Sequence, residues 1–388
     1  MLRLIRYNPT GQAKEPKVYD LEQNPSPTIM AGGVAGDNRS HYWIEDDGKQ
    51  MTIPQTEDKP PYRVPSMTEI DAIPWNGYNV VSTFTGAGGS CLGYRMAGFR
   101  VLWASEFIPA AAEVYRLNHP GVYLDTRDIR SVQPEEILKQ IGIKRGDLDL
   151  LDGSPPCASF STAGKREAGW GKVKNYSETK QRVDDLFFEY ARILDGLQPK
   201  VFIAENVSGL VKGKAKGYFK MILQALKDCG YHVKAKLLDA QWLGVPQMRQ
   251  RVIFQGVRQD LGLEAVYPKP LSYQYSVREA LPNITALRLG GVPENWATSQ
   301  RCASTVAQSD GYRKSNTGYL SAYQVRDSQH ERRHWTIEEL KRICAFPDDF
   351  QLTGSYGQQW ERLGRAVPPV MMGHIASAIR DGVLCKIK

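Results

Sequence analysis

A cysteine in the segment DGSPPCASFS, residues 152–161, is the side chain of this sequence whose surroundings best suit chemistry. The segment follows an apolar alternation, so we expect Cys157 to lie just past the end of a buried strand. Pro155 and Pro156 restrict the backbone before the thiol, and small residues beside it leave space for a substrate. A free cysteine at a strand end can also be a plain packing residue, so Cys157 taken alone leaves both interpretations open.

The elements that would position Cys157 alternate between strands and helices. Residues 78–84 predict a strand, residues 86–99 a glycine-rich loop that enters a helix, and residues 100–106 a second strand. This is the opening βαβ unit of a doubly wound α/β sheet. Further helices are expected over residues 110–118, 184–197 and 218–230, and further strands just before Cys157 and over residues 200–207, 232–240 and 251–257.

Outside residues 78–257 the pattern changes. Residues 258–334 are rich in Ser, Asn, Gln, Tyr and Arg, which is typical of a loop-rich contact region. Helical patterns resume in residues 335–388 and predict helices that return to the main domain. Residues 1–77 contain enough aromatic and apolar side chains to fold against something, so we expect an accessory segment there.

Composition limits the classes of protein that fit. The 388 residues carry 50 Lys and Arg against 42 Asp and Glu, and the net charge of +8 suits a polyanionic partner as well as a merely basic protein. The six cysteines are scattered, without CxxC pairs or a Cys and His cluster, so we expect no disulfide scaffold and no metal. The sequence has no signal-peptide pattern and no window of 18 apolar residues, which predicts a cytoplasmic protein that does not contact a membrane.

The glycine-rich loop predicts a nucleotide-like ligand. Gly86, Gly88 and Gly89 follow a strand and precede a helix, where the absence of Cβ atoms lets a ligand approach the helix N-terminus. Glu106 ends the next strand, the usual position of an acid that binds ribose hydroxyls. The glycine spacing departs from the GxGxxG of dinucleotide sites, which favours a different adenosyl cofactor.

With these elements in order, the sequence resembles the cytosine-C5 DNA methyltransferases from Tyr78 to the C-terminus. Its segments FTGAGG, SPPC, ENV, GVPQMRQRV, RRHWTIEELKRICAFPDDF and RLGRAVPP each resemble a motif of that family, in the family's order. The resemblance implies a Rossmann-like methyltransferase domain over residues 78–257 and a smaller target-recognition region over residues 258–334. It also implies double-stranded DNA as the partner and S-adenosylmethionine as the cofactor.

The family's residue roles carry over to matching positions of this sequence. Cys157 would add as a thiolate to cytosine C6 and make C5 nucleophilic, and Glu205 would hydrogen-bond the exocyclic amine and N3. Arg249 and Arg251 lie two apart on an expected strand, so both would point to one face and hold the base O2. A solvated strand face is the alternative for one of them. The implied cofactor site comprises Phe84, Gly86, Gly88, Gly89, Glu106, Phe107, Asp128, Ile129, Pro156, Leu186, Arg365 and Val367. The cytosine would have to be flipped out of its duplex.

The sequence departs from the family at two positions. Ala158 stands where a glutamine usually follows the catalytic cysteine, and we expect altered loop closure there without loss of the chemistry. Arg365 replaces an asparagine that lies close to the donor in the family, and a guanidinium beside a positive sulfonium is unfavourable unless it turns away. Carboxy-S-adenosylmethionine would reverse that sign and give 5-carboxymethylcytosine. Contact of Arg365 with a DNA phosphate or Glu106 is the alternative, so methylation remains the first expectation.

Other functions stay open on the sequence alone. A tRNA-modifying branch shares these motifs, and a DNA-binding paralogue could keep the fold without activity. Basic residues of the target-recognition region are candidates for phosphate or base contacts: Arg288, Arg301, Arg313, Lys314 and Arg326. Residues 1–77 would form an accessory DNA-recognition segment. We expect a monomer in a bacterial or phage-infected cell, with a cognate restriction endonuclease not required for activity.

Overall fold

The computed structural model of the chain describes most of the predicted domain and parts of the remainder. The described residues are 3–7, 17–20, 41–45, 59–156, 174–176, 179–181, 185–211, 216–288, 296–308, 313–315, 318–320, 324–329 and 331–387. Cys157 and Ala158 lie outside them.

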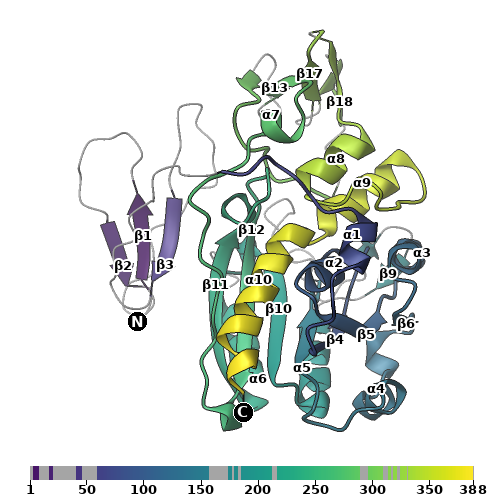
Figure 1. Cartoon of the computed structure of the whole chain (residues 1–388), viewed down its shortest axis with the longest axis vertical. Coiled ribbons are helices and arrows are strands. Elements are labelled where there is room, and N and C mark those ends of the chain that lie inside the picture. Colours follow the sequence, from purple (N-terminus) through teal and green to yellow (C-terminus); the bar gives the residue numbers. More distant parts are fainter. Residues whose placement is uncertain are drawn as a thin grey trace.

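A seven-stranded sheet forms the centre of the molecule (Figure 1). From one edge to the other it contains β11 (Tyr231–Asp239), β12 (Gln250–Arg258), β10 (Val201–Val207), β7 (Leu150–Gly153), β4 (Asn79–Thr83), β5 (Arg100–Ser105) and β6 (Tyr123–Asp125). The strands from β10 to β6 are parallel, and β12 is antiparallel to both of its neighbours. The order reverses beside β4, which makes the sheet doubly wound as the sequence predicts.

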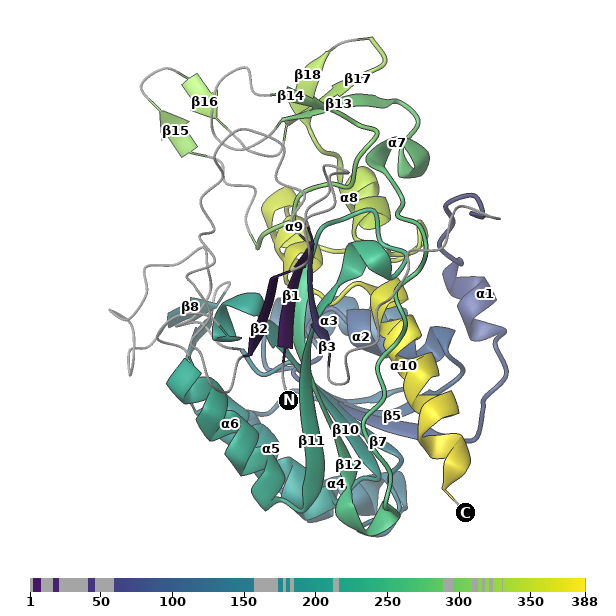
Figure 2. The same ribbon diagram turned by 90° about the vertical axis from the view of Figure 1, so that its left-hand side faces the viewer.

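Helices cover both faces of the sheet (Figure 2). One face is covered by α2 (Gly89–Met96), α3 (Pro109–Asn118) and α10 (Pro369–Gly382), and the other by α4 (Pro134–Ile141), α5 (Leu186–Leu197) and α6 (Lys216–Asp228). Neighbouring strand residues divide between these two layers: Val80 and Ile203 face α2 and α10, whereas Val81 and Phe202 face α5. Because both faces are buried, the central strands read as nearly continuous apolar runs.

The C-terminal segment is helical and packs on the sheet. Its helices are α8 (Ile337–Ile343), α9 (Tyr356–Arg365) and α10, followed by the 3-10 turn η6 (Leu384–Lys386). Helix α10 lies so close to α2 that a Cβ added at Gly93 would stand 2.5 Å from the Cβ of Met372. The glycine therefore permits the contact that docks the end of the chain on the sheet.

A second, smaller sheet lies in the region predicted to be rich in loops. It contains β14 (Trp296–Thr298), β13 (Ile284–Arg288), β17 (Gln324–Asp327) and β18 (Arg332–His334), all antiparallel, with α7 (Val277–Ala280) before it. Leu287 and Val325 on one face share a buried cluster with Leu340 of α8 and Trp360 of α9. This cluster fixes the small sheet to the C-terminal helices.

The remaining described elements are short. They are the antiparallel strands β1 (Arg3–Tyr7), β2 (Lys17–Asp20) and β3 (His41–Glu45), the pair β8 (Lys174–Tyr176) and β9 (Thr179–Gln181), the pair β15 (Arg313–Ser315) and β16 (Gly318–Leu320), helix α1 (Met67–Asp71), and the 3-10 turns η1 (Ile129–Ser131), η2 (Ser208–Val211), η4 (Ala240–Trp242) and η5 (Gln259–Leu261). Within the described ranges, no helix has the length and apolar character needed to cross a membrane, and no group of three or more His, Cys, Asp or Glu residues is arranged to hold a metal.

Candidate active site

The predicted site residues gather at the carboxyl edge of the parallel strands. Because β4, β5, β7 and β10 run in one direction, the loops that follow them leave the sheet at the same edge. The glycine-rich loop follows β4, Glu106 follows β5, and Pro156 lies in the loop after β7. Glu205 is the third residue from the end of β10. Residues far apart in sequence therefore meet at one end of the sheet.

The glycine-rich loop has an unusual backbone conformation. Gly86 and Gly88 have φ of 56° and 90°, and Phe84 has a φ of 55°, which strains a residue with a side chain. Gly88 caps α2, and a Cβ there would stand 2.3 Å from Nε2 of His119. At Gly89 an added Cβ would stand 2.3 Å from a backbone oxygen of the C-terminal segment. The loop is held tightly from two sides.

Glu106 is buried at the base of this loop, at 8% exposure. One carboxylate oxygen accepts a hydrogen bond from the N–H of Gly86 and the other from the N–H of Ile108, both at 2.7 Å. Burial raises the pKa of Glu106, and these two backbone donors oppose that rise. A carboxylate has further lone pairs, so Glu106 can still accept hydroxyl donors from a ligand.

The two residues predicted to contact an adenine, Asp128 and Ile129, follow strand β6. Asp128 caps η1 and Ile129 is buried in the cluster that also contains Leu186. Arg130 joins them: its guanidinium lies 2.9 Å from an oxygen of Asp128 and 2.6 Å from an oxygen of Asp185, which precedes α5. The hydrogen bond to Asp185 raises the pKa of Arg130. No sequence pattern indicates this bridge, because its two ends are 55 residues apart.

The start of the predicted nucleophile loop is fixed to its neighbours. The side-chain amide of Asn206 donates to the carbonyl of Pro155 at 3.2 Å, and the N–H of Ser154 donates to the carbonyl of Thr83 at 3.4 Å. Cys157 follows directly, outside the described residues. The chain leading to this cysteine is therefore tied to both the ENV strand and the strand before the glycine-rich loop.

Glu205 and Arg251 form a buried ion pair. Nε of Arg251 lies 2.7 Å from Oε1 of Glu205, and the two side chains are 12% and 10% exposed. Their strands pair antiparallel, with Val207 opposite Arg251, so the ion pair runs diagonally across the ladder. Burial lowers the pKa of Arg251, and Glu205 opposes that shift. The guanidinium thus orients the carboxylate that the sequence predicts to contact a base.

Arg249 has different partners from Arg251. It precedes β12 and is 1% exposed, and its guanidinium donates to the carbonyls of Val306, Gly364 and Ala366 at 2.9, 2.9 and 2.7 Å. The prediction that both arginines would converge on one base rested on strand alternation. That alternation does not apply to Arg249, because it lies outside the strand.

Gln247 reinforces the same junction. Its Nε2 donates to the carbonyl of Ile343 at 3.3 Å, and its Oε1 accepts from the N–H of Val306 at 3.1 Å. Gln247 and Arg249 therefore join the small-sheet region and the C-terminal helices to the main sheet.

The last motif lies against the glycine-rich loop. Val367 is buried, and its carbonyl is the atom that a side chain at position 89 would strike. Arg365 ends α9, with Nη2 2.7 Å from an oxygen of Glu361 one helical turn earlier. Burial raises the pKa of Glu106, the predicted ribose-binding acid, and the charge of Arg365 is among the smaller influences that oppose this rise. On the sequence alone, a carboxylated donor was the partner that would offset the positive charge of Arg365. In the structure Glu361 lies against Arg365 and offsets that charge.

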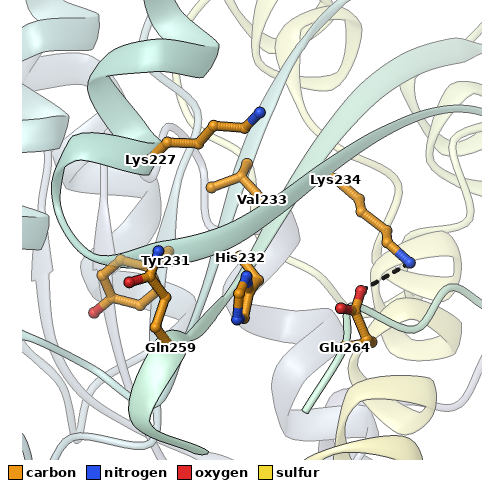
Figure 3. A pocket seen from close by; sticks show the side chains of 7 residues that line it. All are labelled: Lys227, Tyr231, His232, Val233, Lys234, Gln259 and Glu264. Atoms are coloured by element: carbon orange, nitrogen blue, oxygen red, sulfur yellow. Dashed lines mark ion pairs between the residues drawn. The ribbon is translucent and has the colours of Figure 1, made fainter. Parts of the chain in front are cut away.

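A separate pocket of about 330 Å³ lies at the other end of the sheet (Figure 3). It is lined by Lys227, Tyr231, His232, Val233, Lys234, Gln259 and Glu264. Lys234 lies 2.9 Å from Glu264, so two of the charged lining groups already form an ion pair. The lining includes none of the predicted site residues.

Known proteins are similar to this chain in sequence. Residues 78–288 and 283–381 match the family described as C-5 cytosine-specific DNA methylase. Type II methyltransferase M.FnuDI of Fusobacterium nucleatum is 31% identical over 268 residues, which cover 68% of this chain and 72% of that protein. Type II methyltransferase M.NgoPII of Neisseria gonorrhoeae is 26% identical over 345 residues, which cover 79% of this chain and 96% of that protein.

Solved structures share the fold. Dnmt2 methyltransferase of S. pombe matches with a TM-score of 0.55 at 19% identity, covering 78% of this chain and 99% of that one. A protein described as a DNA modification methyltransferase encoded within an E. coli prophage matches with a TM-score of 0.59 at 21% identity, covering 79% of this chain and all of that one.

The close approach at Gly89 predicts a stability effect. Gly89→Ala should lower the free energy of unfolding by about 1–3 kcal/mol, because the new Cβ meets a backbone carbonyl that cannot turn away. Gly121→Ala is the control, since nothing lies within 4 Å of a Cβ there. Urea unfolding curves measure both. Equal midpoints for the two variants would contradict the packing described for the loop.

The buried ion pair predicts a larger effect. Arg251→Ala should cost about 3–5 kcal/mol of unfolding free energy, because it leaves the Glu205 carboxylate buried without its cation. Adding Glu205→Gln to Arg251→Ala should recover part of that loss. Asp260→Ala, which breaks the more exposed ion pair with Arg258 at the end of the same strand, should cost no more than about 1 kcal/mol. Similar losses for Arg251→Ala and Asp260→Ala would show that the Glu205 pair is not desolvated.

Proposed function

The chain belongs to the C-5 cytosine-specific DNA methylase family, and from that membership we propose that it methylates C5 of a flipped-out cytosine in double-stranded DNA through a covalent bond between Cys157 and C6. The observation that carries this proposal is the hydrogen bond from Asn206 to Pro155. It holds the loop that leads to Cys157 beside the strand that presents Glu205. A nucleophile and an acid for one pyrimidine ring thus come from adjoining strands.

The residues around the glycine-rich loop fit S-adenosylmethionine as the donor. Nothing lies within 4 Å of a Cβ at Gly86, so the backbone there is open to a ligand, and Glu106 keeps free lone pairs for ribose hydroxyls. The partly exposed Asp128 offers a polar group for the adenine ring, whereas Ile129 is only 4% exposed. We assign the donor site to Phe84, Gly86, Gly88, Gly89, Glu106, Phe107, Asp128, Ile129, Pro156, Leu186, Arg365 and Val367. When bound, S-adenosylmethionine supplies an electrophilic methyl group.

The chain's own residues then act on the cytosine. The Cys157 thiolate adds to C6, and the electron pair of the C5–C6 double bond moves so that C5 can take the methyl group. Glu205 hydrogen-bonds N3 and the exocyclic amine and stabilises the charge that develops as the bond to C6 forms. Loss of the C5 proton and expulsion of the thiolate restore the double bond. Arg251 orients Glu205, and Arg249 acts as a positioning residue that holds the surrounding segments.

Methyl transfer is favoured over carboxymethyl transfer. The Arg365 guanidinium lies 2.7 Å from Glu361, which offsets its positive charge near the donor site. Glu361 therefore weakens the repulsion that an ordinary sulfonium donor would meet from Arg365. Both curated relatives described above are methyltransferases by name. A role in DNA modification, such as protection from a restriction endonuclease, follows from the same similarity.

One face of the small sheet supports DNA as the substrate. Strand register places Arg288 opposite Trp296, and Arg326 opposite Arg332. The guanidinium of Arg326 lies 4.5 Å from the centre of the Trp296 ring, and that of Arg332 lies 5.7 Å from it. This register gathers positive charge on one face of the small sheet, which suits an anionic partner.

A glutamine orients two of these arginines. Oε1 of Gln324 accepts a hydrogen bond from Arg288 and another, at 3.0 Å, from Arg332. Planar guanidinium groups held in place suit phosphate oxygens and the O6 and N7 edge of guanine. Sequence reasoning named Arg288 and Arg326 and missed Trp296, Gln324 and Arg332, whose importance depends on strand register. Arg288 is only 3% exposed, so we propose that Arg326 and Arg332 of this face contact the target DNA.

The reaction predicts a strict requirement for the thiol. Cys157→Ala should reduce cytosine modification at least roughly a thousandfold, because no other group can add to C6. Tritium transfer from S-adenosylmethionine to duplex DNA measures the rate, and mass spectrometry of the nucleosides should identify 5-methylcytosine. Wild-type activity in Cys157→Ala would overturn the covalent mechanism.

The same assay separates the alternative functions. Incorporation into tRNA rather than DNA would assign the RNA substrate, and 5-carboxymethylcytosine formed from carboxy-S-adenosylmethionine would assign the other donor. A duplex containing 5-fluorocytosine should trap the wild-type protein covalently. Failure to trap, together with absence of transfer, would indicate an inactive DNA-binding paralogue.

The cationic face predicts salt-dependent binding. Arg332→Ala should weaken binding of the target duplex and, where the contact is to phosphate, reduce the slope of log K against log salt by about 1. A contact to guanine would instead relax the target sequence at one position, by about 1–3 kcal/mol. Arg145→Ala removes the same charge in the loop before β7, at the opposite end of the main sheet, and should leave affinity nearly unchanged. Equal losses of DNA affinity in the two variants would show that the effect comes from net charge alone.

A further inference from the structure

A third buried acidic side chain lies beneath this site and has no part in the roles above. Asp152 of β7 is 1% exposed and precedes Cys157 by five residues. In the sheet it lies beside Ser82 of β4 and Ile203 of β10. Side chains alternate along a strand, so Glu205, two residues beyond Ile203, points to the same face. The Asp152 side chain therefore points to the same face of the sheet as Glu205, two residue positions further from the carboxyl edge of the sheet.

Two hydroxyl groups hold the Asp152 carboxylate. Oγ of Ser82 donates to Oδ2 at 2.7 Å, and the hydroxyl of Tyr94 donates to Oδ1 at 3.0 Å. Oγ1 of Thr83 also donates to the Asp152 carbonyl, at 3.1 Å. Ser82 and Thr83 end the strand before the glycine-rich loop, and Tyr94 lies in the helix after it. The carboxylate thus ties both ends of that loop to the strand that leads to Cys157.

Asp152 is costly to bury in its charged form. Burial raises its pKa to about 7, the hydrogen bonds from Ser82 and Tyr94 lower it, and Glu205 raises it further. In the described part of the chain, the other titratable groups in electrostatic contact with Asp152 are Cys91 and Tyr94 of α2, Tyr115 of α3 and Tyr190 of α5. None of these groups is a cation.

The raised pKa fixes the sign of the stability effect. The folded state binds the Asp152 proton more tightly than the unfolded state, so this residue reduces stability increasingly as the pH rises from the ordinary aspartate pKa of about 4 to about 7. At pH 8 a neutral side chain of the same shape would suit the fold as well or better. Stability therefore does not account for an ionisable group at this position.

We propose that Asp152 is a positioning residue that fixes the donor-binding loop against the nucleophile strand, and that it does so as a carboxylate. The proposal rests on the function proposed above. The ionised group accepts both hydroxyl donors at once. When it is protonated, one oxygen becomes a donor, and either Ser82 or Tyr94 must turn its hydroxyl. A displacement of about 1 Å between reacting groups can reduce the rate about a hundredfold.

The test is Asp152→Asn, measured with S-adenosylhomocysteine as the probe of the donor site. Between pH 6 and 8, wild-type binding should strengthen with a midpoint near pH 7, and the Asn variant should bind more weakly and lack that dependence. At pH 8 the variant's kcat should fall between about tenfold and a hundredfold. Its thermal unfolding midpoint at pH 8 should equal or exceed that of the wild type.

Asp149→Asn is the matched control. Asp149 is also a buried aspartate just before β7, but it accepts from the N–H of Asn79 and pairs with Lys200 at 2.7 Å, at the far end of the strand. This variant should lose thermal stability and keep the pH dependence of probe binding. The two aspartates thus separate an effect on the loop from an effect on the fold.

The possible outcomes decide between the roles. Wild-type probe affinity and pH dependence in Asp152→Asn would overturn the proposal, and so would a loss of activity matched by a lower unfolding midpoint at pH 8. Probe binding and unfolding do not require catalysis. If the wild-type protein binds the probe with the expected pH dependence and transfers no methyl group, the function proposed above fails and the role of Asp152 in the loop stands.

Discussion

The buried guanidinium of Arg249 joins three parts of the chain that lie far apart in sequence. It enters from the residue before β12 and donates to Val306, Gly364 and Ala366. Val306 belongs to the segment that leads toward the small sheet, and Ala366 precedes the residue whose carbonyl contacts Gly89. The position of the last motif against the glycine-rich loop therefore depends on this one side chain. A lysine could not replace it, because three carbonyls in different directions require the planar guanidinium fork.

The site buries three carboxylates in three different ways. Glu205 has a guanidinium partner, Glu106 has two backbone N–H donors, and Asp152 has two hydroxyl donors. An ion pair fixes a charge strongly, backbone donors fix it while leaving lone pairs open, and hydroxyls can reverse their direction. Each arrangement agrees with its proposed task, which is to bind a base, to bind ribose hydroxyls, or to hold a loop in one protonation state.

The small sheet separates its two faces by chemistry. Leu287 and Val325 pack on the C-terminal helices, whereas the alternate positions carry Arg288, Arg326 and Arg332 around Trp296. Period-two alternation thus lets strands of three to five residues serve both as an anchor and as a contact surface. The affinity of the cationic face for an anion and its attachment to the rest of the protein depend on different residues, so one can change without the other.

The sequence alone predicted the main fold and the edge where the site lies. Strand and helix periodicity located β4, β5, β10, β11 and β12 and the helices between them, because these patterns arise from neighbouring residues. The short strand β6 and helix α4 were missed, since their apolar patterns are brief. Cys157 remains a prediction from sequence, because it lies outside the described residues.

The partners of long side chains were decided only by the tertiary structure. Alternation suggested one face for Arg249 and Arg251, yet Arg249 precedes the strand and binds carbonyls from two distant segments. On the sequence alone, Arg365 suggested an anionic donor, whereas its helix places Glu361 within reach as its partner. No sequence pattern singles out Asp152, and only the folded chain brings the hydroxyl groups of Ser82 and Tyr94 to its carboxylate. Local sequence fixes the direction in which a backbone runs, but a charged group bonds to whichever atoms the folded chain brings within about 3 Å.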